Sequence, residues 1–164
     1  MEYNVSEHIL PFLHHVGFTV SDLDASVDFY CNKLGFKLFN RWTEPMQGEA
    51  TGVGMGVPGA SIELAQLVGY GCMLEFIQYL DHVGSKQRIA PNHAGLGHVA
   101  FLVDDLDAFK AHLESEGVEF CSDPIVLDTS KWVHFYDCDH IRVEVMQFSK
   151  PLLDQYLELM NIKL

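Results

Sequence analysis

The chain has 164 residues, of which 48% are hydrophobic and 20% charged, the balance of an ordinary globular protein rather than a disordered or fibrous one. Its net charge is −13, with 10 basic against 23 acidic residues, and no cluster of four or more Lys or Arg occurs. Nucleic acids and anionic membranes bind basic surfaces, so we expect neither as a partner.

The N-terminal residues and the cysteines predict a cytoplasmic protein. Residues 1–8 are acidic and polar, unlike the basic and then apolar start of a secretory signal, and no stretch approaches 18 uninterrupted apolar residues. The four cysteines are widely spaced without a Cys-x-x-Cys pair. This favours reduced thiols over a disulfide framework or a thiolate metal site.

An internal repeat divides the chain into two similar modules. Residues 15–25 (HVGFTVSDLDA) match residues 98–108 (HVAFLVDDLDA) at eight of eleven positions, 83 residues apart. A second pair, residues 73–78 (MLEFIQ) and 142–147 (RVEVMQ), is 69 residues apart. The first module is therefore 14 residues longer between its motifs, and the Gly-rich stretch 45–59 accounts for the extra length.

The first module, residues 9–93, is predicted to be β-α-β-β-β. Alternating apolar residues indicate a strand over about 13–20, and an apolar stripe at helical spacing indicates a helix over about 22–34 that ends at Gly35. Three further strands are expected at about 36–42, 60–68 and 72–79.

The second module, residues 94–150, repeats this order. A strand, a helix ending at Gly117 and three strands are expected at about 96–103, 105–116, 118–127, 131–136 and 141–148. The tail, residues 151–164, has apolar residues at helical spacing, which predicts an amphipathic helix that docks on the body or on a partner subunit. The predicted fold class is therefore α+β: two tandem βαβββ modules and a C-terminal amphipathic helix.

Two histidines and two glutamates occupy equivalent positions in the modules: His15, Glu75, His98 and Glu144. Strand alternation alone would allow the glutamates to face solvent and the histidines to lie in the core. An unpaired buried carboxylate costs several kcal/mol, however, and its occurrence in both copies favours a shared site. If a pseudo-twofold packing brings the four side chains together, they suit one divalent metal per site: Zn, Ni, Co, Mn or Fe.

Other polar residues are further candidates for the site. His14 should point to the opposite face of the first strand from His15, so only one of the two can be a ligand. His134 lies on a strand that alternates in both directions and could face the cleft as a substrate contact. His140 and Glu49 are candidate substrate-binding residues, against the simpler interpretations of a turn residue and a solvated loop charge.

The two halves resemble the vicinal oxygen chelate superfamily, which includes glyoxalase I, methylmalonyl-CoA epimerase, extradiol dioxygenases and the fosfomycin and bleomycin resistance proteins. The resemblance covers about residues 12–148 and rests on HVGFTVSDL, FY, LGF and LEF in the first half and GHVAFLVDD and VEV in the second. It implies that the paired modules form a curved mixed sheet with a central metal cleft, and that His15, Glu75, His98 and Glu144 fall on the four ligand positions.

The chain departs from the family pattern in one turn. Many members have Asp-Pro-Asp-Gly before the last strand, where this chain has residues 137–140 (DCDH). The turn must be made without Gly, with Asp or His in the left-handed region of the backbone.

The resemblance also implies a metal-dependent enzyme acting on a small-molecule substrate. Four protein ligands on an octahedral ion leave two positions, enough for a substrate that chelates the metal through adjacent oxygens. An enolate-like intermediate would then be stabilised by the ion, while Glu144 or Glu75 moves a proton as the catalytic base, with Glu49 a weaker third candidate. We therefore expect a glyoxalase-type lyase or an epimerase/isomerase.

Three alternatives stay open. An extradiol-type dioxygenase uses two His and one carboxylate, so Glu75 as a fourth ligand counts against it without excluding it. A thiol-transfer resistance enzyme needs a cationic pocket, and the basic residues are scattered. A non-catalytic small-molecule-binding resistance protein would normally lack the ligand set. The chain is a possible homodimer, whose modules pair within one chain or between two.

Overall fold

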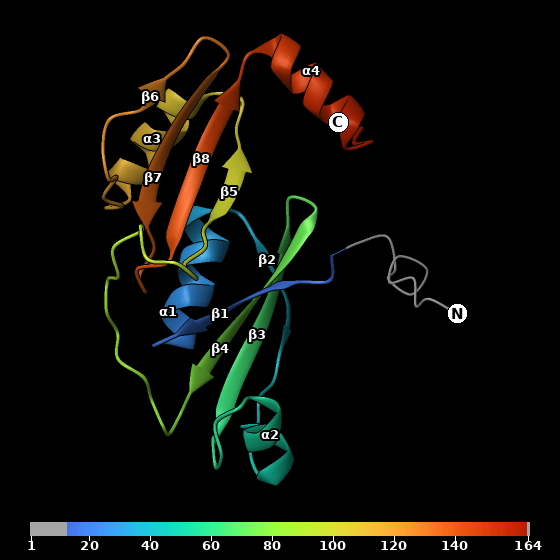
Figure 1. The fold of residues 1–164 in the computed structure, drawn as a ribbon, viewed down its shortest axis with the longest axis vertical. Helices are drawn as coiled ribbons and strands as arrows, with labels where there is room; N and C mark the ends of the chain where they lie inside the picture. Colours follow the sequence, from blue (N-terminus) through green and yellow to red (C-terminus); the bar gives the residue numbers. More distant parts are fainter. Residues whose placement is uncertain (1–12, 164) are drawn as a thin grey trace. The chain divides into compact units, whose positions relative to one another are not determined.

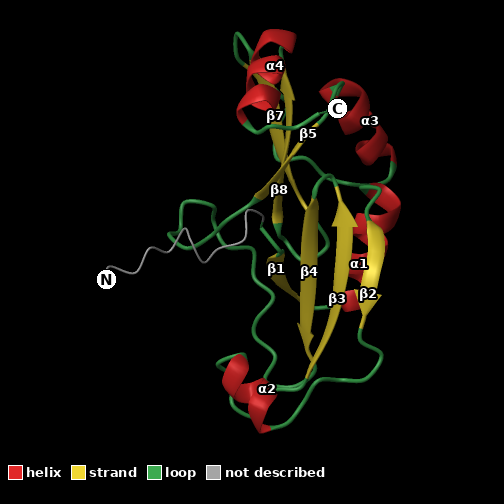
Figure 2. Cartoon of the chain, turned by 90° about the vertical axis from the view of Figure 1, so that its right-hand side faces the viewer, coloured by secondary structure: helices red, strands yellow, loops and turns green. Residues whose placement is uncertain are grey.

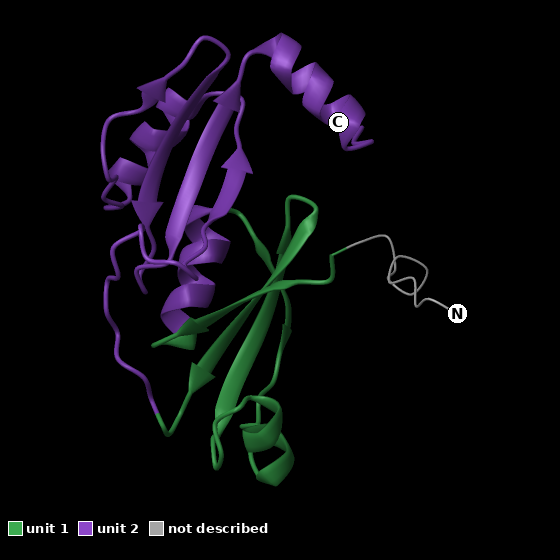
Figure 3. Ribbon diagram, in the orientation of Figure 1, with its two compact units in different colours: residues 1–23, 35–82 green, residues 24–34, 83–164 purple. Residues whose placement is uncertain are grey.

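The computed structural model describes residues 13–163. The start of the module predicted from residue 9 and the last residue of the tail lie outside this part of the chain. The chain divides into two compact units (Figure 3). Unit 1 comprises the residues up to 23 together with 35–82, and unit 2 comprises 24–34 together with 83–164.

Unit 1 is built on a four-stranded mixed sheet (Figure 1). The strand order is β1-β4-β3-β2, with β1 parallel to β4 and the other neighbours antiparallel. Their bounds are Val16–Val20 for β1, Lys37–Arg41 for β2, Ile62–Gly69 for β3 and Cys72–Tyr79 for β4. The Gly-rich stretch before β3 folds partly as a short helix, α2 (Glu49–Gly54). Glu49 therefore begins a helix and does not lie on a loop.

Unit 2 has a second sheet of the same topology, in the order β5-β8-β7-β6. The strands are β5 (Val99–Leu102), β6 (Ile125–Val126), β7 (Ser130–Tyr136) and β8 (Arg142–Phe148). The helices are α1 (Leu23–Asp28), which continues as a π-helical turn η2 (Phe29–Lys33), α3 (Leu106–Ser115) and α4 (Lys150–Leu159). The predicted α+β class, with two four-stranded mixed sheets of the same topology and a C-terminal helix, is confirmed.

One face of each sheet is apolar, and the repeated glutamates lie on the other. In β4 the side chains of Leu74 and Phe76 are fully buried, and in β8 those of Val143 and Val145 are buried. Because successive side chains of a strand point to opposite faces, Glu75 and Glu144 lie on the faces away from these cores.

Helices α1 and α3 lie behind the same face of the unit 2 sheet (Figures 1 and 2). Leu106 and Leu113 of α3 are fully buried, and the Phe29 ring lies 6.3 Å from the Phe135 ring of β7. Helix α4 contacts β8 through the Tyr156 and Phe148 rings, which are 5.8 Å apart, and none of the residues of α4 is fully buried.

The glutamine found in both repeats binds the first backbone N–H of a helix in each. Gln78 Oε1 accepts a hydrogen bond from the backbone N–H of Leu23, at 2.7 Å, and Gln147 Oε1 accepts one from Leu106, at 3.1 Å. The first N–H groups of a helix have no partner within the helix, so a side-chain acceptor at this position stabilises the helix start. The identity of this residue in the two repeats therefore has a structural reason.

Two segments differ from the sequence expectation or refine it. The strand expected at 118–127 is reduced to Ile125–Val126 and one isolated bridge from Phe120 to Phe135, because Pro124 lacks the N–H that a continuous ladder needs. In the turn before β8, His140 has a φ of 64°. This confirms the prediction that an Asp or His of this turn adopts the left-handed backbone conformation. No helix in residues 13–163 is long and apolar enough to cross a membrane.

Candidate metal centre

In unit 1 the parallel pairing of β1 with β4 brings His15 to Glu75. The register places Gly17 opposite Glu75, and the Nε2 of His15, which immediately precedes β1, lies 3.5 Å from Glu75 Oε1. The other carboxylate oxygen, Oε2, accepts a 2.6 Å hydrogen bond from Gln66 Nε2. Gln66 is directly opposite Glu75 on β3. Both oxygens of Glu75 therefore have a neighbour in the chain.

Unit 2 repeats this geometry with a closer His–Glu contact. Ala100 of β5 is opposite Glu144 of β8, and His98 Nε2 lies 3.0 Å from Glu144 Oε2. The residue opposite Glu144 on the antiparallel neighbour β7 is His134, whose Nε2 lies 3.9 Å from Glu144 Oε1. The two units thus share the glutamate and the histidine beside it, and they differ in the residue opposite the glutamate, which is Gln66 in one and His134 in the other.

His134 is the most buried member of this group. It is 6% exposed, and its Nε2 has no hydrogen-bond partner. Its ring packs edge-on against the rings of Trp132 and His98, at 5.3 and 5.4 Å between centroids. Burial lowers the pKa of His134, and the positive charge of Arg142 lowers it further. The imidazole is therefore neutral at physiological pH and offers an unprotonated nitrogen.

The donor sets in both units fit a divalent cation. Two neighbouring ligands with bonds of about 2.1 Å at right angles lie about 3 Å apart. The His–Glu separations of 3.5 and 3.0 Å are close to this value. In unit 2 the donor atoms of His98, His134 and Glu144 all lie within 4.8 Å of one another. The glutamates are 15% and 14% exposed, so a bound cation would offset the cost of burying their charges.

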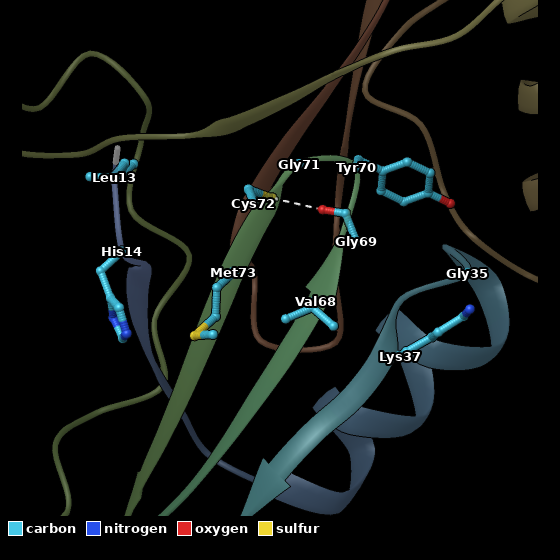
Figure 4. Close-up of a pocket in the computed structure, with 10 residues that line it drawn as sticks. All are labelled: Leu13, His14, Gly35, Lys37, Val68, Gly69, Tyr70, Gly71, Cys72 and Met73. Carbon is cyan, nitrogen blue, oxygen red and sulfur yellow. Dashed lines mark hydrogen bonds between the residues drawn. The ribbon is translucent and has the colours of Figure 1, made fainter. Parts of the chain in front are cut away.

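The structure corrects the prediction for His14. His14 Nδ1 lies 2.6 Å from His15 Nδ1, so the two rings are neighbours rather than on opposite faces. Both residues precede β1, where strand alternation does not apply. His14 also lines an open cavity of about 590 Å³ beside the β3–β4 turn, with Lys37, Tyr70 and Cys72 among the other lining residues (Figure 4). None of the described residues lining this cavity is a predicted metal ligand.

His140 and Glu49 are found away from these groups of donors. His140 lines a cavity of about 460 Å³ in unit 2, together with Phe29, Arg88 and Tyr136, and the described lining residues include neither His134 nor Glu144. Glu49 is exposed at the start of α2. His134 is the predicted substrate contact that does lie beside Glu144. The sequence does not identify Gln66 as a neighbour of Glu75, because the second repeat has a different residue at this position. Only the pairing of β3 with β4 reveals the contact.

Comparisons with known proteins find a matching family model and several relatives. The family model described as Glyoxalase/Bleomycin resistance protein/Dioxygenase superfamily matches residues 12–145. A lactoylglutathione lyase of Schizosaccharomyces pombe is 28% identical over 120 residues, which cover 66% of the chain and 38% of that protein. A 2-epi-5-epi-valiolone epimerase of an Actinomyces species is 29% identical over 133 residues, covering 75% and 72%. A solved glyoxalase family protein of Bacillus cereus superposes with a TM-score of 0.74 at 20% identity, covering 86% and 96%.

Proposed function

Because the chain belongs to the glyoxalase/bleomycin resistance protein/dioxygenase superfamily, we propose that it is a divalent-metal-dependent lyase or epimerase/isomerase. The substrate class is a small molecule with two adjacent oxygen atoms. The observation that carries the proposal is the His–Glu pair found at the equivalent position of both units. The lyase and epimerase names of two relatives support the reaction class.

In this proposal His15, Glu75, His98 and Glu144 supply the ligands of one divalent ion. Paired imidazole and carboxylate donors suit Zn, Ni, Co, Mn or Fe, and the bound ion supplies a Lewis acid for the charge that develops on a substrate oxygen. The equivalence of the two pairs in the repeat supports a shared ion, whether the modules pair within one chain or between two chains.

We assign the proton transfer to Glu144 rather than Glu75. Glu75 holds His15 on one oxygen and a short hydrogen bond from Gln66 on the other. Glu144 has His98 beside Oε2, whereas His134 is 3.9 Å from Oε1, which is too long for a hydrogen bond. Oε1 of Glu144 is therefore better able to accept a proton from a substrate carbon. Glu75 is the second choice of base, and His140 and Glu49 stay predicted substrate contacts.

The test compares Glu144→Gln with Glu75→Gln at saturating metal. Wild-type protein should bind about one divalent ion per chain, measured by metal analysis after dialysis. In deuterated water it should exchange the proton next to the carbonyl in a panel of hydroxyketones and thiol adducts of 2-oxoaldehydes, followed by NMR. Glu144→Gln should slow exchange by roughly 10²–10⁴-fold, the contribution of a positioned general base. Glu75→Gln should mainly weaken metal binding.

Two results would overturn the proposal. Stoichiometric metal binding that survives loss of both His15 and His98 would refute the ligand set. Near-normal exchange by Glu144→Gln with the metal site full would show that Glu144 is only a ligand.

An extradiol-type dioxygenase is the second candidate, and one observation favours it. His98, His134 and Glu144 are two histidines and one carboxylate, the donor set of non-haem Fe(II) oxygenases. Oxygen uptake with a catechol in the presence of Fe(II), absent with Zn(II), would establish this reaction instead. A small-molecule-binding resistance protein would bind its compound and leave it unchanged in either assay.

A further inference from the structure

We infer that His134 Nε2 is an additional ligand of the divalent ion while no substrate is bound, so that unit 2 by itself carries a three-donor site made of His98, His134 and Glu144. A substrate that chelates the ion through two oxygens would replace His134. This inference rests on the proposed metal-dependent function and adds a residue that the repeat does not predict. Three observations carry it: the burial of an unpartnered nitrogen, the spacing of the donors, and the contrast with the equivalent residue of unit 1.

The first observation is the unpartnered Nε2 of His134. A buried polar atom without a hydrogen bond costs about 1–3 kcal/mol, and native proteins satisfy nearly all such atoms. His134 is 6% exposed, and no group of the described chain satisfies its Nε2. This nitrogen lies 3.9 Å from Glu144 Oε1, so an ion held by Glu144 would be within its reach and would supply the missing partner.

The second observation is the spacing of the three donor atoms. They lie within 4.8 Å of one another, and two opposite ligands of an ion with bonds of about 2.1 Å lie about 4.2 Å apart. The 4.8 Å limit exceeds this span by only about 0.6 Å, so the three donors have nearly the spacing of ligands on one ion. The group contains two imidazoles and a carboxylate, donors that suit a divalent cation, and the positive charge of Arg142 acts on His134 from outside the group.

The third observation is the difference between the two repeats. Gln66 occupies the position of His134 in unit 1, and its amide donates to Glu75 at 2.6 Å. If His134 only held its carboxylate in place, we would expect the same short contact with Glu144. The distance is instead 3.9 Å, and the nitrogen is unpartnered. The position thus holds a carboxylate in one repeat and offers a metal ligand in the other.

The test uses His134→Gln, which copies the residue of unit 1, and Gln66→His, which makes the reverse change. His112→Gln, on the exposed side of α3, is the matched control. Each protein is loaded with Cu(II), and the nitrogen hyperfine pattern of its electron paramagnetic resonance spectrum counts the imidazoles on the ion. The Zn(II) dissociation constant is measured by competition with a chelator.

His134→Gln should remove one nitrogen from the Cu(II) spectrum and weaken Zn(II) binding by more than about 100-fold. Mutating a group that only positions a ligand costs about 10–100-fold and leaves the nitrogen count unchanged. A variant lacking His15 and Glu75 should still bind one ion, and adding His134→Gln to it should abolish that binding. His112→Gln should behave as wild type in both measurements.

An unchanged nitrogen count in folded His134→Gln would overturn the inference and leave the proposed function standing. If circular dichroism shows that the variant does not fold, the test is instead made by NMR on wild-type protein with ¹⁵N-labelled histidine. Its His134 Nε2 resonance should shift on Zn(II) binding as those of His15 and His98 do, and a resonance that stays in place would refute the assignment. Wild-type protein that binds no divalent ion would refute the proposed function as well.

Discussion

Replacing Tyr30 with Phe tests how unit 2 holds the turn that precedes β8. The fully buried Tyr30 hydroxyl donates a hydrogen bond to Asp137 Oδ2 at 3.0 Å. Asp137 Oδ1 accepts 2.8 Å bonds from the backbone N–H groups of Asp139 and Ile141, which close the turn. Phe keeps the buried ring and removes the hydroxyl, so the change removes the hydrogen bond to the buried carboxylate of Asp137.

We expect Tyr30→Phe to lower the free energy of unfolding by about 1.5–3 kcal/mol, the range for a hydrogen bond to a charged group. For a chain of this size, 1 kcal/mol corresponds to roughly 2–4 °C in melting temperature. Denaturant titration and differential scanning calorimetry measure both quantities. Tyr156→Phe, on the partly exposed face of α4, is the control and should stay within about 0.5 kcal/mol of wild type.

The effect of Tyr30→Phe should depend on pH. Burial raises the pKa of Asp137, while the Tyr30 hydrogen bond and the two backbone bonds lower it, with burial prevailing. A raised carboxyl pKa gives stability that is full below the pKa of the unfolded chain and is lost as pH rises through the folded-state pKa. Without the hydroxyl this pKa rises further, so the loss is greater at pH 7 than at pH 4. An equal or smaller loss at pH 7 would refute this account of Asp137.

Two further predictions concern the helix start and the turn. Gln147→Ala removes the acceptor for the first N–H of α3 and should cost about 0.5–2 kcal/mol in the free energy of unfolding, measured by urea titration; no loss would mean that water replaces the amide. His140→Gly relieves a left-handed backbone conformation, so the melting temperature should be unchanged or higher, and a fall in turnover at unchanged stability would identify His140 as a substrate contact.

The sequence predicts the elements around the two glutamates well, because the same motif occurs twice and each copy supports the other. One repeated motif predicts the strand that follows His15 or His98. The other predicts its parallel neighbour, which contains Glu75 or Glu144. The third position of each site depends instead on which residue of the hairpin neighbour lies opposite the glutamate. That register follows from the geometry of each hairpin, and in unit 1 from Tyr70 and Gly71, both with positive φ. Gln66 is therefore found only in the structure, and so is the position of His134, a predicted substrate contact, directly opposite Glu144.

The prediction for His14 fails for a different reason. Alternation of side chains holds within a paired strand, and the pairing of β1 begins only at Val16. Beyond the end of a ladder the backbone is free to turn, so adjacent side chains can lie together. The helix over 22–34 shows a related limit, since its apolar stripe predicts a helix but does not reveal which sheet that stripe covers. The contacts of Tyr30 and Phe29 are with β7 and the turn of unit 2.

Residues 24–34 belong to unit 2, although they come before most of unit 1 in the sequence. The chain passes between the two units at residues 24, 35 and 83, so no single cut releases one unit intact. A fragment that stops at the boundary between the repeats would carry a helix without its sheet. The complementary fragment would expose Phe135 and leave Asp137 without the Tyr30 hydroxyl. Recombination that exchanged one half for a distant homologue would meet the same mismatch, so the two halves of the gene are expected to be inherited together.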